Sequence, residues 1–159
     1  MAESKLEMKK AIVADLQELY RNLSDQDADE CRSFGLLPED AILTSALASG
    51  DNCWAARING DLVAVFGGGK DSTETALTEK SQGWILTTKA ARKHRKEFVK
   101  HARAVSGILV NRFAPLYNFI DTRYLSGMKW LSSLGFYVNL KDRYQMPGGS
   151  EAYLVFHLG

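Results

Sequence analysis

The chain has 159 residues, 45% hydrophobic and 25% charged, with a formal net charge of +1, which suits one globular domain over residues 1–159 rather than two. This charge balance excludes a global electrostatic attraction to nucleic acid or anionic lipid, and no apolar run approaches the ~20 residues that span a bilayer. The first residues lack the apolar core of a secretion signal, so we expect a cytoplasmic protein without a membrane partner.

The first 50 residues predict a strand followed by three helices. The alternation in KLEMKKA indicates an edge strand, and apolar residues recur at helical spacing in AIVADLQELYRNL. Ser24 or Asp25 is a suitable N-cap for a second, short helix that runs toward Phe34 and Gly35. The segment PEDAILTSALASG has Pro at its start and Gly at its end, the asymmetry expected of a helix.

The segment CWAARINGDLVAVFGGG contains two β-rich runs joined by Asn59-Gly60. This dipeptide accommodates the positive φ angles of a type I′ turn, so it predicts a hairpin. The run from Gly67 to Lys70 lacks the spacing and the Ser or Thr of a phosphate-binding loop. We interpret it as a flexible exit from the strand. Residues 70–81 are polar and predict a surface loop or a short helical excursion.

The second half predicts two strands on either side of a long helix. GWILTT indicates a buried strand, a helix follows from about Ala90 to Arg112, and a strand from Leu116 to Asp121 leads into another helix that ends at Gly135. FYVNL and AYLVFHL predict a closing antiparallel hairpin. Because a helical crossover joins the strands flanking the long helix, we expect them to be parallel neighbours. The element order indicates a mixed α/β or α+β domain.

Cations crowd the first half of the long helix, against a single acid, Glu97: Lys89, Arg92, Lys93, Arg95, Lys96, Lys100 and Arg103. Cations near a helix N-terminus oppose the macrodipole by about 0.3–1 kcal/mol each. Three interpretations are open: a solvated basic face, a phosphate-rich ligand such as coenzyme A at the carboxyl ends of the strands, or nucleic acid. The absence of interleaved aromatic residues for base stacking argues against nucleic acid.

Four segments in the same order resemble the fold of the Gcn5-related N-acetyltransferases (GNAT): LYRNLSDQDADECRSFG, DNCWAARINGDLVAVFG, GWILTT and LYNFIDTRYLSGMKWLSSLGF. They cover about residues 8 to 138. The sequence is most similar to small GNAT-like proteins of bacteriophages, which include an internal virion protein of short-tailed phages. The resemblance implies a central, mostly antiparallel sheet that contains a splayed pair of parallel strands.

The resemblance also implies a V-shaped opening between strand residues 84–88 and 116–121, in which the pantetheine arm of acetyl-CoA would lie. By position, the residues that would line it are Trp84, Ile85, Leu86 and Thr87. Lys89, Arg92 and Lys93 would lie near the phosphates. An amine of unidentified type would accept the acetyl group. No metal is expected, since the two cysteines have neither CxxC spacing nor a nearby pair of histidines.

The sequence departs from the family pattern at the catalytic positions. TTKAARKHRK has no glycine where family members carry a glycine-containing phosphate loop. Tyr124 occupies the position of a common Asn, and Leu131, which cannot donate a proton, that of a frequent Tyr. We therefore consider Tyr124 and Asp121 as the acid or the water-positioning base. The competing interpretations are a helix cap for Asp121 and a half-buried aromatic for Tyr124.

Two functions follow from the sequence. The first is a GNAT-type N-acetyltransferase of phage type, with degenerate catalytic motifs, that acts in the infected cell on acyl-CoA and an amine. The alternative is a non-catalytic protein, associated with the virion or with host proteins, whose cleft is filled by side chains such as Trp84 and Tyr117.

Overall fold

The computed structural model describes residues 5–70 and 81–159. The loop expected between residues 70 and 81 therefore lies, apart from its ends, outside the described residues. The elements in chain order are β1 (Leu6–Lys10), α1 (Val13–Asn22), α2 (Asp25–Ser33), α3 (Pro38–Ser49), β2 (Cys53–Ile58), β3 (Asp61–Lys70), β4 (Ser81–Thr87), α4 (Lys89–Lys93), α5 (Arg95–Phe113), β5 (Leu116–Asp121), α6 (Leu125–Ser133), β6 (Tyr137–Gln145) and β7 (Glu151–His157).

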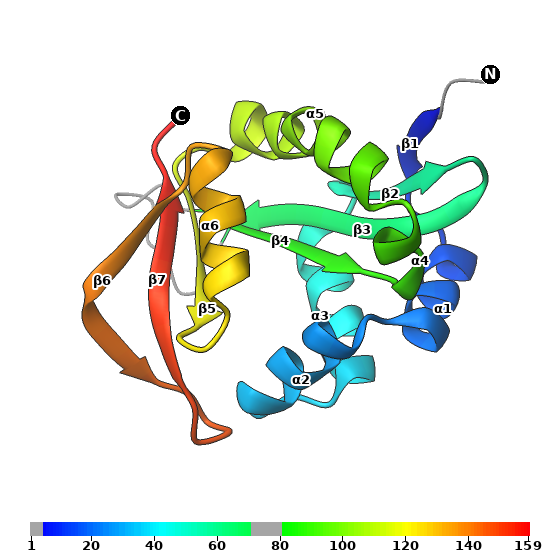
Figure 1. The fold of residues 1–159 in the computed structure, drawn as a ribbon. Coiled ribbons are helices and arrows are strands. Elements are labelled where there is room, and N and C mark those ends of the chain that lie inside the picture. Colours follow the sequence, from blue (N-terminus) through cyan, green and yellow to red (C-terminus); the bar gives the residue numbers. More distant parts are fainter. Residues whose placement is uncertain (1–4, 71–80) are drawn as a thin grey trace.

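The strands form one seven-stranded sheet in the order β1-β2-β3-β4-β5-β7-β6. Neighbouring strands are antiparallel except β4 and β5, which are parallel, because α4 and α5 carry the chain across between them (Figure 1). The mixed α/β class and the mostly antiparallel sheet with a parallel pair are thus confirmed. In the described part of the chain, no helix is long and apolar enough to cross a membrane.

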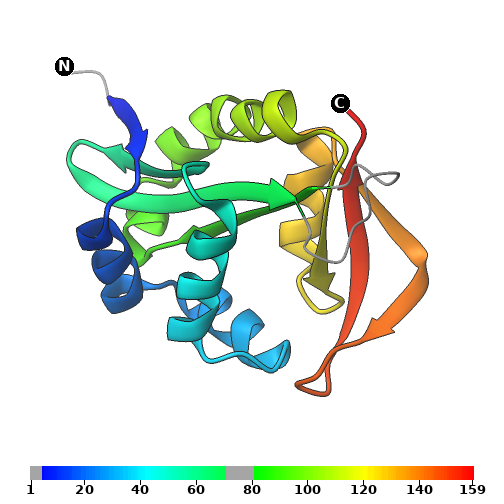
Figure 2. The same cartoon turned by 180° about the vertical axis from the view of Figure 1, so that it is seen from behind.

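Helices cover both faces of the sheet (Figures 1 and 2). On one face, Phe98 and Leu109 of α5 belong to a buried cluster with Phe66 of β3, and α6 continues this layer over β5 and β7. On the opposite face, Leu19 of α1 and Ile42 of α3 pack against β2 and β3. Both faces of the central strands are therefore shielded from solvent, which explains why β2 and β3 are apolar on both sides.

The local turn and cap signals form as predicted. Asn59 and Gly60 have φ angles of 51° and 86°, so the hairpin turn between β2 and β3 uses the two left-handed residues that a type I′ turn requires. The Ser24 side chain caps α2 by accepting a hydrogen bond from the Asp27 amide at 3.3 Å. Helix α3 begins at Pro38 and ends before Gly50.

The interpretation of the glycine run as a flexible exit is wrong, since β3 continues through Gly67, Gly68 and Gly69 to its end at residue 70. The glycines allow other elements to approach the strand closely. A Cβ on Gly69 would lie 2.6 Å from the Ala48 carbonyl oxygen, and one on Gly68 would lie 2.8 Å from the Phe113 ring. Neither position has room for a side chain, so the run is a packing feature of β3.

The basic segment forms two helices rather than the single helix expected from Ala90 to Arg112. Helix α4 ends and α5 begins at His94, which has φ −104° and ψ 32°. The His94 side chain is only 13% exposed and its Nε2 lies 2.7 Å from Asp61 Oδ2, at the hairpin turn. This tertiary contact holds the chain at the break. The four residues of α5 that face the sheet are buried.

Candidate active site

The parallel strands β4 and β5 separate after two paired positions. Ser81 pairs with Leu116 and Gln82 with Tyr117, and beyond these the strands diverge (Figure 1). Asn118 lies at the point of separation. Its Nδ2 donates to the Gly83 carbonyl at 2.5 Å, and its Oδ1 accepts from the Phe119 amide at 2.7 Å. One side chain thus satisfies backbone groups of both strands that would otherwise pair with each other.

Beyond this point, the free edge of β4 presents backbone groups to the opening. The Thr88 amide donates to Val63 of β3 at 3.0 Å. Consecutive residues of an antiparallel ladder direct their backbone groups to opposite sides. The amides and carbonyls of Ile85 and Thr87 therefore point away from β3, into the opening.

The N-terminal end of α2 occupies the groups of Thr87. Asp27 Oδ2 accepts from both the amide and the hydroxyl of Thr87 at 2.7 Å, and the Ser24 amide donates to the Thr87 carbonyl at 2.9 Å. These three bonds attach α2 to the end of β4. Thr87 therefore anchors a helix, and of the β4 residues predicted to line the opening, Ile85 retains backbone groups that face it.

The C-terminal end of α2 contacts the loop between β6 and β7. The Ser150 hydroxyl donates to the Ser33 carbonyl at 2.7 Å. Gly148 lies so close to α2 that a Cβ there would come within 2.6 Å of the Arg32 carbonyl oxygen. Helix α2 therefore crosses the open end of the V and contacts the structure on both sides of it. The sequence predicted an open V, whereas the structure forms a window bounded by β4, β5 and α2.

A cavity of about 130 Å³ lies in this window. Leu109 of α5 and Leu131 of α6 line it on one side of the sheet, and Glu30 of α2 lines it on the other. A second cavity of about 570 Å³ lies between α2, α3 and β4. The residues that line both cavities are Glu30, Trp84, Ile85 and Asn118. The window thus opens from the α5/α6 face toward the α2/α3 face.

Glu30, which sequence reasoning did not identify, is the acidic residue at the junction of these cavities. Burial, together with the nearby charges of Asp27 and Asp121, raises the pKa of Glu30 to about 8. A carboxyl group with such a pKa exchanges protons near neutral pH and suits general acid–base catalysis. The sequence signal was the i, i+3 spacing of Asp27 and Glu30, which places both on one face of α2.

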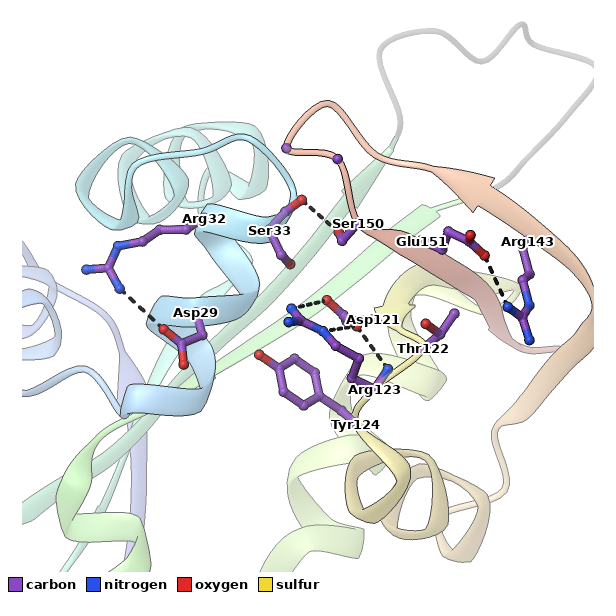
Figure 3. Close-up of a pocket in the computed structure, with 12 residues that line it drawn as sticks. Asp29, Arg32, Ser33, Asp121, Thr122, Arg123, Tyr124, Arg143, Ser150 and Glu151 are labelled. Carbon is purple, nitrogen blue, oxygen red and sulfur yellow. Dashed lines mark hydrogen bonds and ion pairs between the residues drawn. The ribbon is translucent and has the colours of Figure 1, made fainter.

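Tyr124 and Asp121, the predicted catalytic pair, lie together in a third cavity of about 910 Å³ between α2, the β5–α6 connection and the β6–β7 loop (Figure 3). The Tyr124 hydroxyl is 3.5 Å from the Gln26 carbonyl. Burial, and next the charge of Glu30, raise the pKa of Tyr124, so the hydroxyl stays protonated at neutral pH.

The Asp121 carboxylate is fully buried and accepts hydrogen bonds from Arg123. The Arg123 amide and Nε donate to Oδ1 at 2.9 and 3.0 Å, and a terminal nitrogen donates to Oδ2 at 2.8 Å. These bonds hold the pKa of Asp121 below its ordinary value. Asp121 is not the cap of α6, because the N-cap residue is Tyr124 and no side chain in the described part of the chain caps this helix. The Asp121 carboxylate binds Arg123 instead, and a carboxylate committed to Arg123 has little affinity for a further proton.

The three basic residues predicted near the phosphates do not line any of the cavities described above. Lys89 and Arg92 are exposed on α4. Lys93 is also exposed, and its Nζ lies 3.6 Å from Asp61 Oδ2, at the hairpin turn. Helix α4 follows the end of β4 directly, so Lys89 is the first cation after this strand. Trp84 and Leu86 face the larger cavity beside α3, and the Trp84 indole donates to the Ser49 hydroxyl at 2.7 Å.

Neither family models nor curated proteins match the chain at the level of sequence. Solved structures do match. Aminoglycoside acetyltransferase AAC(6')-Ib in complex with coenzyme A superposes with a TM-score of 0.64 at 16% identity, covering 95% of this chain and 94% of that one. Ard1 from Thermoplasma volcanium has a TM-score of 0.68 at 12% identity, covering 97% and 99%.

The ribosomal-protein-alanine N-acetyltransferase from Brucella melitensis has a TM-score of 0.66 at 15% identity, covering 96% of this chain and 99% of that one. The likeness spans nearly the whole of each chain. The chain therefore has the fold of the GNAT acyl-CoA N-acyltransferases.

Proposed function

We propose that the protein is an acetyl-CoA-dependent N-acetyltransferase whose acyl donor is held in the window between β4, β5 and α2. The observation that carries the proposal is the cavity that connects the two faces of the sheet through this window and has Glu30 at its mouth. Structural neighbours support the donor and the type of acceptor, since AAC(6')-Ib has been solved with ribostamycin and coenzyme A.

The residues in and around the window fit such a donor. The amide and carbonyl of Ile85 face the opening and can bond the amide groups of a pantetheine arm, as a neighbouring strand would. Leu109, Leu131 and Phe136 give the α5/α6 side of the cavity an apolar wall. Lys89 and Arg92, exposed just after β4, would hold the diphosphate. This segment lacks glycine, so charged side chains take the place of backbone amides.

The chemistry is acetyl transfer to an amine. Acetyl-CoA supplies the acetyl group as an activated thioester. As the amine nitrogen bonds to the acetyl carbon and the carbon–sulfur bond breaks, the Glu30 carboxylate accepts the proton that the nitrogen loses. Tyr124, which the structure keeps protonated, donates a proton to the departing sulfur. Asp121 positions Arg123 and the start of α6, beside Tyr124, and takes no part in proton transfer.

Calorimetric titration with acetyl-CoA tests the window directly. We expect saturable binding by the wild-type protein and its loss in Leu131→Trp, which fills the window from the α6 side. The control is Leu140→Trp, at a position on β6 that is 64% exposed, and thermal denaturation verifies that both variants are folded. Absence of binding by the wild type, or unchanged binding by Leu131→Trp, would reject the proposed donor site.

The phosphate contacts are tested separately by charge removal. Lys89→Ala and Arg92→Ala should each weaken acetyl-CoA binding by an amount that shrinks as salt is added, whereas Lys100→Ala, farther along the same basic segment, should have little effect. An equal effect of all three substitutions would show that only the general charge matters.

The bacteriophage origin and the virion or host partners expected from the sequence stay predictions.

A further inference from the structure

If the proposed donor site is correct, the cavity between α2, α3 and β4 lies where the acceptor amine would bind. It shares Glu30, Trp84, Ile85 and Asn118 with the window, so a molecule held in it can reach an acetyl group that enters from the α5/α6 face. Its volume of about 570 Å³ lies within the ~300–1,000 Å³ that small-molecule pockets have.

The charged side chains that line this cavity are acidic. Asp27 and Glu30 contribute carboxyl groups, and Lys, Arg and His are absent from its described lining residues. The remaining polar groups on the α3 side include the hydroxyls of Thr44 and Ser45. An ammonium group that enters beside Glu30 favours the ionised form of this carboxyl group and is compensated by it. An anion would instead meet carboxyl groups in a partly desolvated site, without a cation to pair with.

Gln82 and Asn118 add side-chain amides to the lining, and much of the remainder is apolar or aromatic. Phe34 and Leu36 close the α2 side of the cavity, and Trp84 and Leu86 form its floor on β4. The Trp84 ring is held in place because its Nε1 donates to Ser49 on α3. Such a surface suits an alkyl or aromatic body attached to the amine.

The cavity of about 910 Å³ on the other side of α2 is lined by three arginines. Its described lining residues provide no unpaired cation that could bind an anionic group of the acceptor. Its arginines are each paired with an acid: Arg32 with Asp29 at 3.5 Å, Arg123 with Asp121 at 2.8 Å and Arg143 with Glu151 at 3.3 Å. The Ser150–Ser33 contact between the β6–β7 loop and α2 joins the two walls of this cavity (Figure 3).

We propose that the acceptor is a small cationic amine that carries no anionic group, an alkylamine, arylalkylamine or polyamine, bound between α2, α3 and β4 with its ammonium group beside Glu30. The proposal rests on the acetyltransferase function above and narrows its acceptor. It excludes free amino acids and phosphorylated amines, because these bring a carboxylate or phosphate into the acidic cavity.

Binding of matched ligands tests the acceptor without acetyl-CoA. Phenethylamine and phenylalanine have the same aromatic body and amine and differ by one carboxylate. Calorimetry should show saturable binding of phenethylamine or of spermidine, with phenylalanine at least about tenfold weaker. Ser45→Trp, which fills the cavity from α3, should abolish this binding. The control is Leu47→Trp, at a position on the same helix that is 81% exposed.

Acetyl-CoA titrations of the same proteins separate the two proposals. If acetyl-CoA binds to Ser45→Trp as it does to the wild type, the donor and acceptor sites are distinct, as expected. If acetyl-CoA binds but neither amine does, or if phenylalanine binds as well as phenethylamine, the acceptor proposal is overturned while the donor site stands. If acetyl-CoA does not bind, the donor site fails, and the amine titrations still decide whether this cavity selects cations.

Discussion

The Glu30→Gln substitution should remove a distinct part of the pH dependence of folding stability. Burial, with the charges of Asp27 and Asp121, raises the pKa of Glu30 to about 8, from 4.5 in a solvated chain. The folded state therefore binds this proton more tightly than the unfolded state does. The resulting stabilisation is complete below about pH 4.5 and is lost as the pH rises toward 8. Glutamine has the same shape and does not titrate.

Proton linkage sets the magnitude of this pH dependence of the free energy of unfolding. Where the folded state holds this proton and the unfolded state does not, the free energy of unfolding falls by at most about 1.4 kcal/mol for each pH unit. The free energy of unfolding of the wild type, relative to that of Glu30→Gln, should therefore decrease steadily as the pH rises from about 5 to 8. The slope depends on the difference in the number of bound protons between the folded and unfolded states.

Urea denaturation of both proteins at half-unit steps of pH measures this difference, and carbon-13 NMR of the glutamate carboxyl groups follows the titration itself. Asp29→Asn, an exposed carboxylate on the same helix, controls for the loss of a surface charge. Parallel stability curves for wild type and Glu30→Gln across this range would refute the assignment. Glu30 would then be an ordinary solvated carboxylate, without the properties of a general base.

Three further substitutions, one of them with a matched control, test the packing around the window. Gly69→Ala places a Cβ 2.6 Å from a carbonyl oxygen of α3 and should destabilise the fold by about 1–3 kcal/mol, whereas Gly107→Ala, in α5 with nothing within 4 Å, should stabilise it by about 0.5–1 kcal/mol; urea denaturation compares them, and equal effects would contradict the close approach. Asn118→Ala leaves the Gly83 carbonyl and a β5 amide without their partner and should cost about 1–3 kcal/mol in the same assay. Trp84→Phe removes the bond to α3 and should weaken stability by about 0.5–1.5 kcal/mol, together with a loss of phenethylamine affinity.

The sequence by itself determined the elements whose signals are local. Asn59-Gly60 produced the hairpin because few other residue pairs tolerate two positive φ angles, and Ser24 and Pro38 marked the starts of two helices. The parallel arrangement of β4 and β5 also followed from the sequence, because a helical connection between adjacent strands imposes it. The turn and the helix starts depend on residues a few positions apart, and the parallel pairing depends only on the order of consecutive elements.

Only the tertiary structure decided the boundaries that distant contacts impose. The glycine run looked flexible by composition, yet α3 and Phe113 press on it from other parts of the chain and require a strand without side chains. The predicted single helix is divided at His94 because Asp61, 33 residues earlier, binds its ring. Neither partner can be identified from local sequence.

The candidate site also shows the difference between what local sequence predicts and what tertiary contacts decide. Sequence reasoning placed Trp84, Ile85 and Leu86 at cavities that the structure contains, because they lie on the strand next to the split. It did not identify Glu30, because the proton affinity of a carboxyl group depends on burial and on neighbouring charges, and here Asp121 comes from the far side of the window. An i, i+3 pair of acids on a helix is ordinarily a solvated surface. The pKa of Glu30 is raised only because α2 lies across the gap between two separated strands, where this carboxyl group is buried and close to Asp121.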